Sequence, residues 1–131
     1  MSDNTYTILV VEDEKPLVDA ISAKLRRSGF DVVSARTVTQ ALAYMEDLLH
    51  IDVVWLDHYL LGQTTGLDFV ATVKGENSSW QNVPIFVVSN TASPDKVQTY
   101  LRLGVNKYYT KSDYRLDGII SDIQSYLQNP D

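Results

Sequence analysis

Short hydrophobic runs alternate with longer segments of helical periodicity along the whole chain, and this alternation most constrains its fold. Crossovers long enough to hold a helix imply that the strands pair in parallel. The third and fourth runs are apolar on both faces, as strands buried between two helix layers should be. The pattern therefore predicts a three-layer α/β/α sandwich with a five-stranded parallel sheet. The predicted strands are Ile8–Val11, Phe30–Ala35, Val53–Leu56, Ile85–Val88 and Lys107–Thr110.

The segments between the runs carry helix signals. Thr37 and Gln40 have the spacing of a capping box. Gly29, Gly75 and Gly104 stand where helices would end. The predicted helices run from Pro16 to about Ser28, Thr37 to about Leu49, Leu67 to Lys74, Ser93-Pro94 to Gly104, and about Arg115 to Leu127.

Four of the five runs end in residues that can handle phosphate or a metal ion, namely Glu12-Asp13, Asp57, Ser89 and Lys111. Only the second run ends without such a residue. The carboxyl ends of parallel strands meet at one edge of a sheet, where ligands bind. Mg²⁺ prefers oxygen ligands, and a carboxylate can act as a nucleophile towards phosphorus. The set predicts Mg²⁺ binding and phosphoryl transfer to Asp57.

Composition excludes several classes of function. A net charge of −6 with scattered Lys and Arg argues against direct nucleic-acid binding. No apolar run reaches the roughly 20 residues that a membrane span needs, and the polar N-terminus lacks a signal pattern. We therefore expect a cytoplasmic protein. The absence of cysteine excludes disulfides and thiolate catalysis, and 131 residues suit one domain, 1–131.

In their order and spacing, four motifs resemble the receiver domain of bacterial two-component response regulators. The resemblance covers about residues 6–128. It implies a chemotaxis-regulator-like, flavodoxin-like fold with strand order 2-1-3-4-5. The motifs are Ile8–Glu14 with its acidic pair, Asp52–Asp57, Pro84–Ser89 and Gly104–Lys111.

The resemblance also implies roles for individual residues. Asp57 would accept a phosphoryl group from a histidine kinase or a phosphotransfer protein, so the chain is a phosphoacceptor module rather than an enzyme. Ser89 and Lys111 would bind phosphoryl oxygens, and Tyr108 falls at the rotating aromatic of the family. Ser89 and Tyr108 would switch the surface of the fourth helix, fifth strand and fifth helix, where a second receiver or a downstream protein would bind. The implied Mg²⁺ ligands are Glu12, Asp13, Asp57 and the backbone carbonyl of Tyr59.

The chain departs from the family pattern at several places. The first acid of the pocket is Glu12 rather than the commoner aspartate, and Asn90 follows Ser89 where a small residue is usual. Ser112 replaces the usual proline after Lys111, so a cis bond there would cost about 3 kcal/mol. The stretch 60–66 lacks the usual proline and is a residue longer than common.

Two other functions stay open. An aspartate-dependent phosphohydrolase also uses a strand-end aspartate with Mg²⁺, but many carry a second acid two residues on, where this chain has Tyr59. A receiver-like scaffold that is never phosphorylated is the other, and a flavin carrier is a weak third. We expect His58 to have a packing or surface role, because its side chain points away from that of Asp57.

Overall fold

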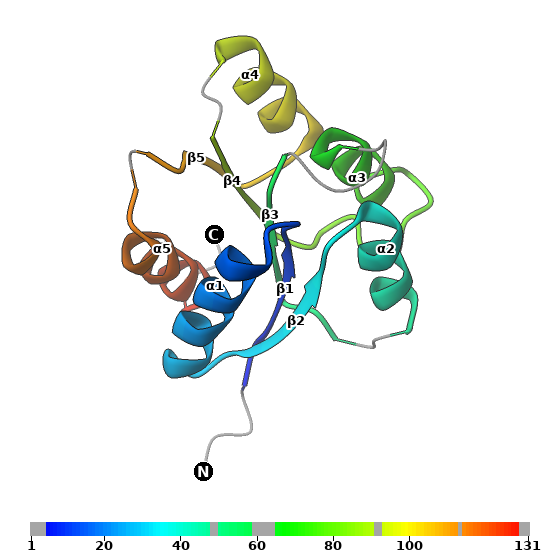
Figure 1. The fold of residues 1–131 in the computed structure, drawn as a ribbon. Helices are drawn as coiled ribbons and strands as arrows, with labels where there is room; N and C mark the ends of the chain where they lie inside the picture. Colours follow the sequence, from blue (N-terminus) through cyan, green and yellow to red (C-terminus); the bar gives the residue numbers. More distant parts are fainter. Residues whose placement is uncertain (1–4, 48–49, 59–64, 91–92, 113, 129–131) are drawn as a thin grey trace.

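The computed structural model describes residues 5–47, 50–58, 65–90, 93–112 and 114–128. Five parallel strands form one sheet in the order β2-β1-β3-β4-β5, and a helix follows each strand (Figure 1). The predicted fold class and strand order are confirmed. The elements are β1 (Thr7–Val11), α1 (Lys15–Arg27), β2 (Asp31–Ala35), α2 (Val38–Asp47), β3 (Val53–Leu56), α3 (Gly66–Val73), β4 (Ile85–Ser89), α4 (Pro94–Leu103), β5 (Lys107–Thr110) and α5 (Leu116–Gln128).

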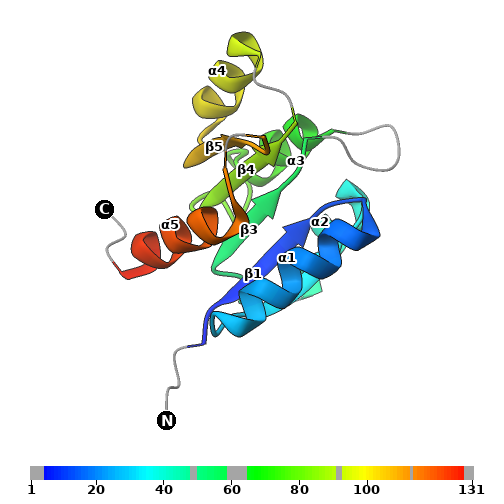
Figure 2. The ribbon, with the colours of Figure 1, turned by 60° about the vertical axis from the view of Figure 1, so that its left-hand side comes forward.

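Helices cover both faces of the sheet (Figures 1 and 2). On β1, Leu9 and Val11 face the layer of α2, α3 and α4, whereas Ile8 and Val10 face α1 and α5. An ion pair between Lys24 and Asp117 (2.9 Å) joins α1 to α5 at the surface. Because both faces are covered, β1, β3 and β4 read as continuous apolar runs rather than as alternating ones.

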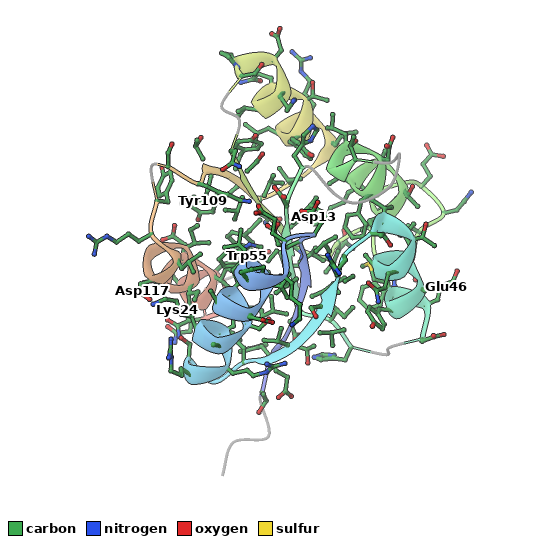
Figure 3. The ribbon with its side chains drawn as sticks, viewed as in Figure 1. Asp13, Lys24, Glu46, Trp55, Tyr109 and Asp117 are labelled. Atoms are coloured by element: carbon green, nitrogen blue, oxygen red, sulfur yellow. The ribbon has the colours of Figure 1, made fainter. Side chains whose placement is uncertain are left out.

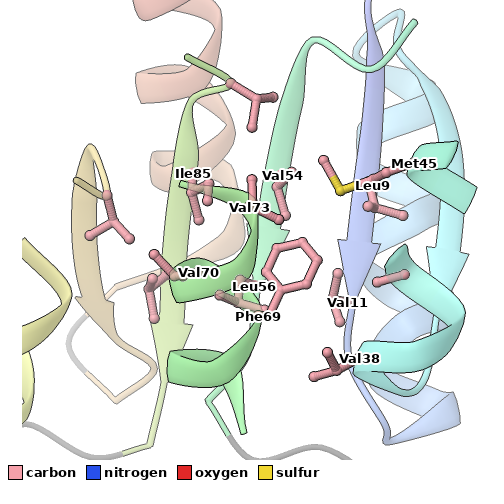
Figure 4. Packing of buried hydrophobic residues seen from close by; sticks show 14 of the residues in the cluster. Leu9, Val11, Val38, Met45, Val54, Leu56, Phe69, Val70, Val73 and Ile85 are labelled. Atoms are coloured by element: carbon pink, nitrogen blue, oxygen red, sulfur yellow. The ribbon is translucent and has the colours of Figure 1, made fainter. Parts of the chain in front are cut away.

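The core on the α3 side is organised around Phe69, which is fully buried. Figure 4 shows its ring between α3 and the strands β1 and β3, close to Val54 and Leu56. Full burial of one such side chain contributes about 1.5–3 kcal/mol to stability. On the opposite face of β3, Trp55 is fully buried among residues of α1 and α5. This packing fixes β3, and with it the residue that follows the strand.

The helix ends differ from the predicted ones by one or two residues, and Leu49 lies outside the described residues. The predicted capping box at α2 forms only in part. The N–H of Gln40 donates to Thr37 Oγ1 (3.0 Å), but Gln40 Oε1 accepts from the N–H of Arg36 (2.8 Å) instead of that of Thr37. Positive φ angles at Gly29 (96°) and Gly104 (107°) confirm the caps of α1 and α4.

The start of α3 was not fully predicted from the sequence. Thr65 is its N-cap and forms a capping box with Asp68, so the helix begins at Gly66. At its other end the helix stops at Val73 with Lys74 as the C-cap, one residue before the predicted last residue, Lys74. The capping box holds the first turn of α3 against the end of β3, where the N–H of Gly66 donates to the carbonyl of His58 (3.0 Å).

Gly66 permits a close approach of three segments. An added Cβ would lie 2.5 Å from the Tyr100 hydroxyl and 2.9 Å from the carbonyl oxygen of Asp57. We predict that Gly66→Ala lowers the free energy of unfolding by about 1–3 kcal/mol, because overpacking forces these groups apart. Gly118→Ala is the control, since nothing lies within 4 Å of its added Cβ, and it should raise stability by about 0.5–1 kcal/mol. Urea unfolding of both variants tests this, and equal stability would contradict it.

Tyr109 ties β5 to α5. Its hydroxyl donates to Asp122 Oδ2 (2.6 Å), and Lys107 Nζ lies 3.3 Å from the same carboxylate oxygen. Burial, followed by the hydrogen bond to Asp122, raises the pKa of Tyr109 well above its usual value of 10.0. A phenol whose pKa is raised in the folded state stabilises that state fully below its unfolded pKa, and this contribution is lost as the pH rises above it.

We therefore predict that Tyr109→Phe lowers the free energy of unfolding near neutral pH by about 1–2 kcal/mol, through loss of a hydrogen bond to a carboxylate. The difference from wild type should shrink above about pH 10, where the unfolded phenol ionises and the folded one does not. Urea unfolding across this pH range measures it. A difference that stays constant through pH 10 would argue against the raised pKa.

Candidate functional site: an acidic cluster at the carboxyl edge of the sheet

Three carboxylates meet where β1 and β3 end. The N–H of Asp57 donates to the carbonyl of Val11 (2.9 Å), which holds the two strand ends together. One carboxylate oxygen from each of Glu12, Asp13 and Asp57 lies within 4.8 Å of the other two. Figure 3 shows Asp13 at this edge of the sheet. The structure thus brings together the three acids that the sequence placed at strand ends.

Lys111 supplies the opposing charge. Its Nζ lies 3.2 Å from Glu12 Oε1 and 3.6 Å from Asp57 Oδ1. The backbone places it there, because the N–H of Lys111 donates to the carbonyl of Ser89 (2.7 Å) and extends the β4–β5 ladder past Thr110. Ser89, the last residue of β4, is fully buried. The four predicted strand ends therefore all lie at one edge.

Burial governs the charge of the cluster. Glu12 is fully buried, and burial raises its pKa to about 7, with the Asp57 carboxylate adding to the rise and Lys111 opposing it. Burial also raises the pKa of Asp57 above its usual value, against the effects of Lys111 and of the N–H of His58. Because burial makes the charged forms of Glu12 and Asp57 costly, a divalent cation with a preference for oxygen ligands would stabilise the deprotonated cluster beyond what Lys111 supplies.

Of the other predicted site residues, Tyr108 lies within the described part of the chain and Tyr59 does not. The Tyr59 carbonyl lies outside the described residues, as do positions 60–64. Tyr108 is half-buried on β5, and its ring centroid lies 5.6 Å from that of Tyr100. Asn90 is exposed beyond Ser89. The peptide bond before Ser112 is trans, as are all the described peptide bonds.

The sequence analysis missed Arg36. It directly follows β2, the strand whose end was taken to carry no functional residue. Its guanidinium donates from Nε and Nη2 to the carbonyl oxygen of Asp13, at 3.1 and 2.9 Å. Arg36 therefore ties the loop that carries the acidic pair to the neighbouring strand end. Its place after a strand was the available signal, but no pattern indicated a main-chain partner.

The predicted role of His58 was in packing or at the surface. The residue is buried, which agrees with the first alternative, but its contacts were not predicted. Its backbone N–H donates to Asp57 Oδ1 (2.9 Å), and its ring Nδ1 shares a hydrogen bond with the Tyr100 hydroxyl (2.6 Å). Burial lowers the pKa of His58, with Lys96 adding to the effect and Asp68 opposing it. The ring is therefore neutral near neutral pH, with a donor on one nitrogen and an acceptor on the other.

Comparison with known proteins identifies the family. Residues 8–124 match the family model described as the response regulator receiver domain, and the chain belongs to this family. The sensory transduction protein RegX3 of Mycobacterium tuberculosis is 31% identical over 122 residues, which cover 93% of this chain and 51% of that protein. The phosphate regulon transcriptional regulatory protein PhoB of Pseudomonas aeruginosa is 30% identical over 105 residues, 80% of this chain and 44% of that protein.

The fold agrees with this assignment. The solved structure of the phosphorylated cyanobacterial phytochrome response regulator RcpA superposes with a TM-score of 0.83 at 24% identity, covering 98% of this chain and 97% of that one. The chain spans about half the length of the curated relatives it matches. Receiver domains of this kind are phosphorylated by histidine kinases. Among the described residues, no helix is long and apolar enough to cross a membrane.

The crowding of carboxylates has a measurable cost. We predict that Asp57→Asn raises the free energy of unfolding in the presence of a chelator by about 1–2 kcal/mol, a fraction of the roughly 4 kcal/mol that two like charges 4 Å apart exert. The gain should increase as the pH rises from about 4.5 to 7, because the raised folded pKa of Glu12 lowers the stability of the wild-type protein over that interval.

Asp19→Asn is the matched control for this prediction. Asp19 is an exposed carboxylate of α1 paired with Lys15 at 3.1 Å, and such surface pairs contribute little. Urea unfolding of both variants at two pH values gives the comparison. A loss of stability in Asp57→Asn would show that the acids do not repel one another in the folded protein.

Proposed function

We propose that Asp57 accepts a phosphoryl group from a phosphohistidine of a histidine kinase or a phosphotransfer protein. The observation that carries this proposal is the place of the Asp57 carboxylate, buried at the end of β3, 3.6 Å from Lys111 and clustered with two further acids. A carboxylate in this setting is costly unless a cation accompanies it. Membership of the receiver family supports the same role.

Mg²⁺ fits the donor set. Glu12, Asp13 and Asp57 offer carboxylate oxygens close enough to share one small cation, and such oxygens are its preferred protein ligands. When bound, Mg²⁺ supplies positive charge against the carboxylates and the oxygens of the transferred group. Glu12 is one methylene longer than the commoner aspartate, yet its oxygens reach the cluster. The Tyr59 carbonyl is a further proposed ligand by family resemblance.

In the transfer, an oxygen of Asp57 forms a bond to phosphorus while the bond from phosphorus to the imidazole nitrogen of the donor breaks. The electron pair stays on that nitrogen, which takes up a proton. Lys111 Nζ, already beside Asp57 Oδ1, balances the charge that the phosphoryl oxygens bring. We assign the Ser89 hydroxyl to a second contact with these oxygens.

The phosphorylated site would then alter the surface of α4, β5 and α5. Phosphorylation adds charge and acceptor oxygens beside Ser89 and Lys111. Tyr108 is half-buried and packs against Tyr100, so a change in its packing would reach α4. Leu101 on α4 is 42% exposed. We propose this surface as the contact with a second receiver or with a downstream protein.

The chain would act as a phosphoacceptor rather than as a hydrolase of small phosphate esters. Tyr59 stands two residues after Asp57, where many phosphohydrolases place their general acid. Phosphoryl groups of histidine kinases derive from ATP, so we place the protein in the cytoplasm. The intact set of Asp57, Ser89 and Lys111 supports phosphorylation over a purely structural receiver-like role.

The test is incubation with acetyl phosphate and Mg²⁺, followed by intact-mass measurement. We expect the mass of one phosphoryl group to be added, in a form labile to alkali as an acyl phosphate is, and to be absent from Asp57→Asn. Asp19→Asn removes an exposed carboxylate of α1 that pairs with Lys15, and this variant should be phosphorylated like wild type. Wild-type protein that gains no such adduct at Asp57 would refute the proposal.

A further inference from the structure

His58, directly after Asp57, is held from three directions. Its N–H donates to Asp57 Oδ1 (2.9 Å), and its carbonyl accepts from the N–H of Gly66 at the start of α3 (3.0 Å). Its Nδ1 shares a hydrogen bond with the hydroxyl of Tyr100 on α4 (2.6 Å). Figure 1 shows α3 and α4 beside each other near the end of β3. One residue therefore connects the proposed phosphoacceptor to two helices.

The hydrogen bond between His58 and Tyr100 is shielded from water. Tyr100 is fully buried and His58 is 4% exposed. In such a setting a hydrogen bond is electrostatically strong, and loss of one partner leaves the other buried without it. The two rings also meet edge to face, with centroids 5.7 Å apart. A displacement of one side chain therefore either moves the other or breaks the bond.

The atoms around the His58–Tyr100 contact are closely packed, so neither side chain can move freely. A Cβ at Gly66 would lie 2.5 Å from the Tyr100 hydroxyl and 3.1 Å from the His58 Cα. The Tyr100 ring also packs against that of Tyr108 on β5, at 5.6 Å. Close-packed interiors transmit small shifts rather than absorb them. The contact is thus suited to relay a change at the end of β3 into α4.

We propose that Tyr100 is a positioning residue for phosphoryl transfer, acting through His58 on the Asp57 carboxylate. This inference rests on the proposed function of Asp57. The Tyr100 hydroxyl holds the His58 ring in place. The backbone N–H of His58 is thereby directed at Asp57 Oδ1. Orientation of a reacting group matters greatly, since a misplacement of about 1 Å can cost on the order of a hundredfold in rate.

The same contact carries information in the opposite direction. Once Asp57 is an acyl phosphate, its oxygens are poorer acceptors than those of a carboxylate, so the N–H of His58 loses part of its hydrogen bond. The resulting shift reaches Tyr100 and hence α4. Coupling of this kind is reciprocal, so the position of α4 also affects the reactivity of Asp57. This route starts from β3, whereas the Ser89 and Tyr108 route starts from β4 and β5, and both reach α4 at Tyr100.

The first experiment compares two variants that each lose one hydroxyl. Tyr100→Phe removes the partner of His58, whereas Tyr44→Phe removes a half-buried hydroxyl on α2 that accepts from Gln40 Nε2 (3.3 Å). Single-turnover phosphorylation is followed over a range of acetyl phosphate concentrations with Mg²⁺. We expect Tyr100→Phe to react roughly tenfold more slowly at saturation, as loss of one buried hydrogen bond implies. The half-saturating acetyl phosphate concentration and the Mg²⁺ affinity should not change, and Tyr44→Phe should match wild type.

Changes at His58 separate positioning from simple loss of packing. His58→Asn keeps a polar atom near the place of Nδ1 and should restore part of the rate, whereas His58→Leu should be slow. Because both residues act through one contact, adding Tyr100→Phe to His58→Leu should slow the reaction no further. Multiplying defects would count against a shared path.

A third measurement begins with the wild-type protein. The chain has two histidines, and His50 is an exposed internal control paired with Asp52 at 2.9 Å. With ¹⁵N-labelled histidine, beryllium fluoride and Mg²⁺ should shift the Nδ1 resonance of His58 and leave that of His50 in place. The backbone amides of α4 should also move in wild type, and should move less in Tyr100→Phe.

The outcomes distinguish this inference from the function on which it rests. A Tyr100→Phe variant with the wild-type rate and wild-type amide shifts in α4 overturns the positioning role and leaves phosphorylation of Asp57 intact. Wild-type protein that gains no phosphoryl group overturns both. Should Tyr100→Phe fail to fold, an unchanged His58 Nδ1 resonance in wild type is sufficient to reject the inference.

Discussion

The ion pairs of Lys111 with Glu12 and Asp57 allow buried carboxylates to lie together at the carboxyl edge of this sheet. Parallel strands β1 and β3 deliver two carboxylates to one buried spot, where each like-charge pair about 4 Å apart costs around 4 kcal/mol at an effective dielectric near 20. Lys111, reached from β5, lies 3.2 and 3.6 Å from these two acids. The site therefore depends on three strands that are not neighbours in sequence ending at the same level.

That level is set by the core rather than by the site. In the β3 ladders, Leu56 pairs with Val11 of β1 and with Val87 of β4. A slip of β3 by one residue would exchange its two faces, turning Trp55 towards the space that Phe69 fills. Packing on both faces of β3 thus excludes the wrong register and fixes where Asp57 stands. The position of Asp57 at the edge of the sheet is therefore a consequence of how the core side chains of β3 pack.

The sequence predicted those parts of the site that depend on chain order and polarity. Asp57, Ser89 and Lys111 each come at the end of a hydrophobic run. Because the carboxyl ends of parallel strands lie at one edge of the sheet, the three side chains were expected to lie close together. The strand order itself came from family resemblance, since alternation alone permits other orders. What the sequence could not show are contacts without a local pattern. His58 and Tyr100 are 42 positions apart, and Arg36 binds a main-chain carbonyl, which any residue type could supply.

The close contact at the start of α3 links two positions in evolution as well as in space. With the Tyr100 hydroxyl where it is, position 66 admits only a hydrogen atom as its side chain, because a methyl group there would lie 2.5 Å from that oxygen. A relative with a larger residue at the first position must both shorten the second and move the backbone carbonyl of Asp57, which lies 2.9 Å from the added Cβ. In a collection of sequences descended from this one, the glycine should therefore be retained wherever the phenol is retained.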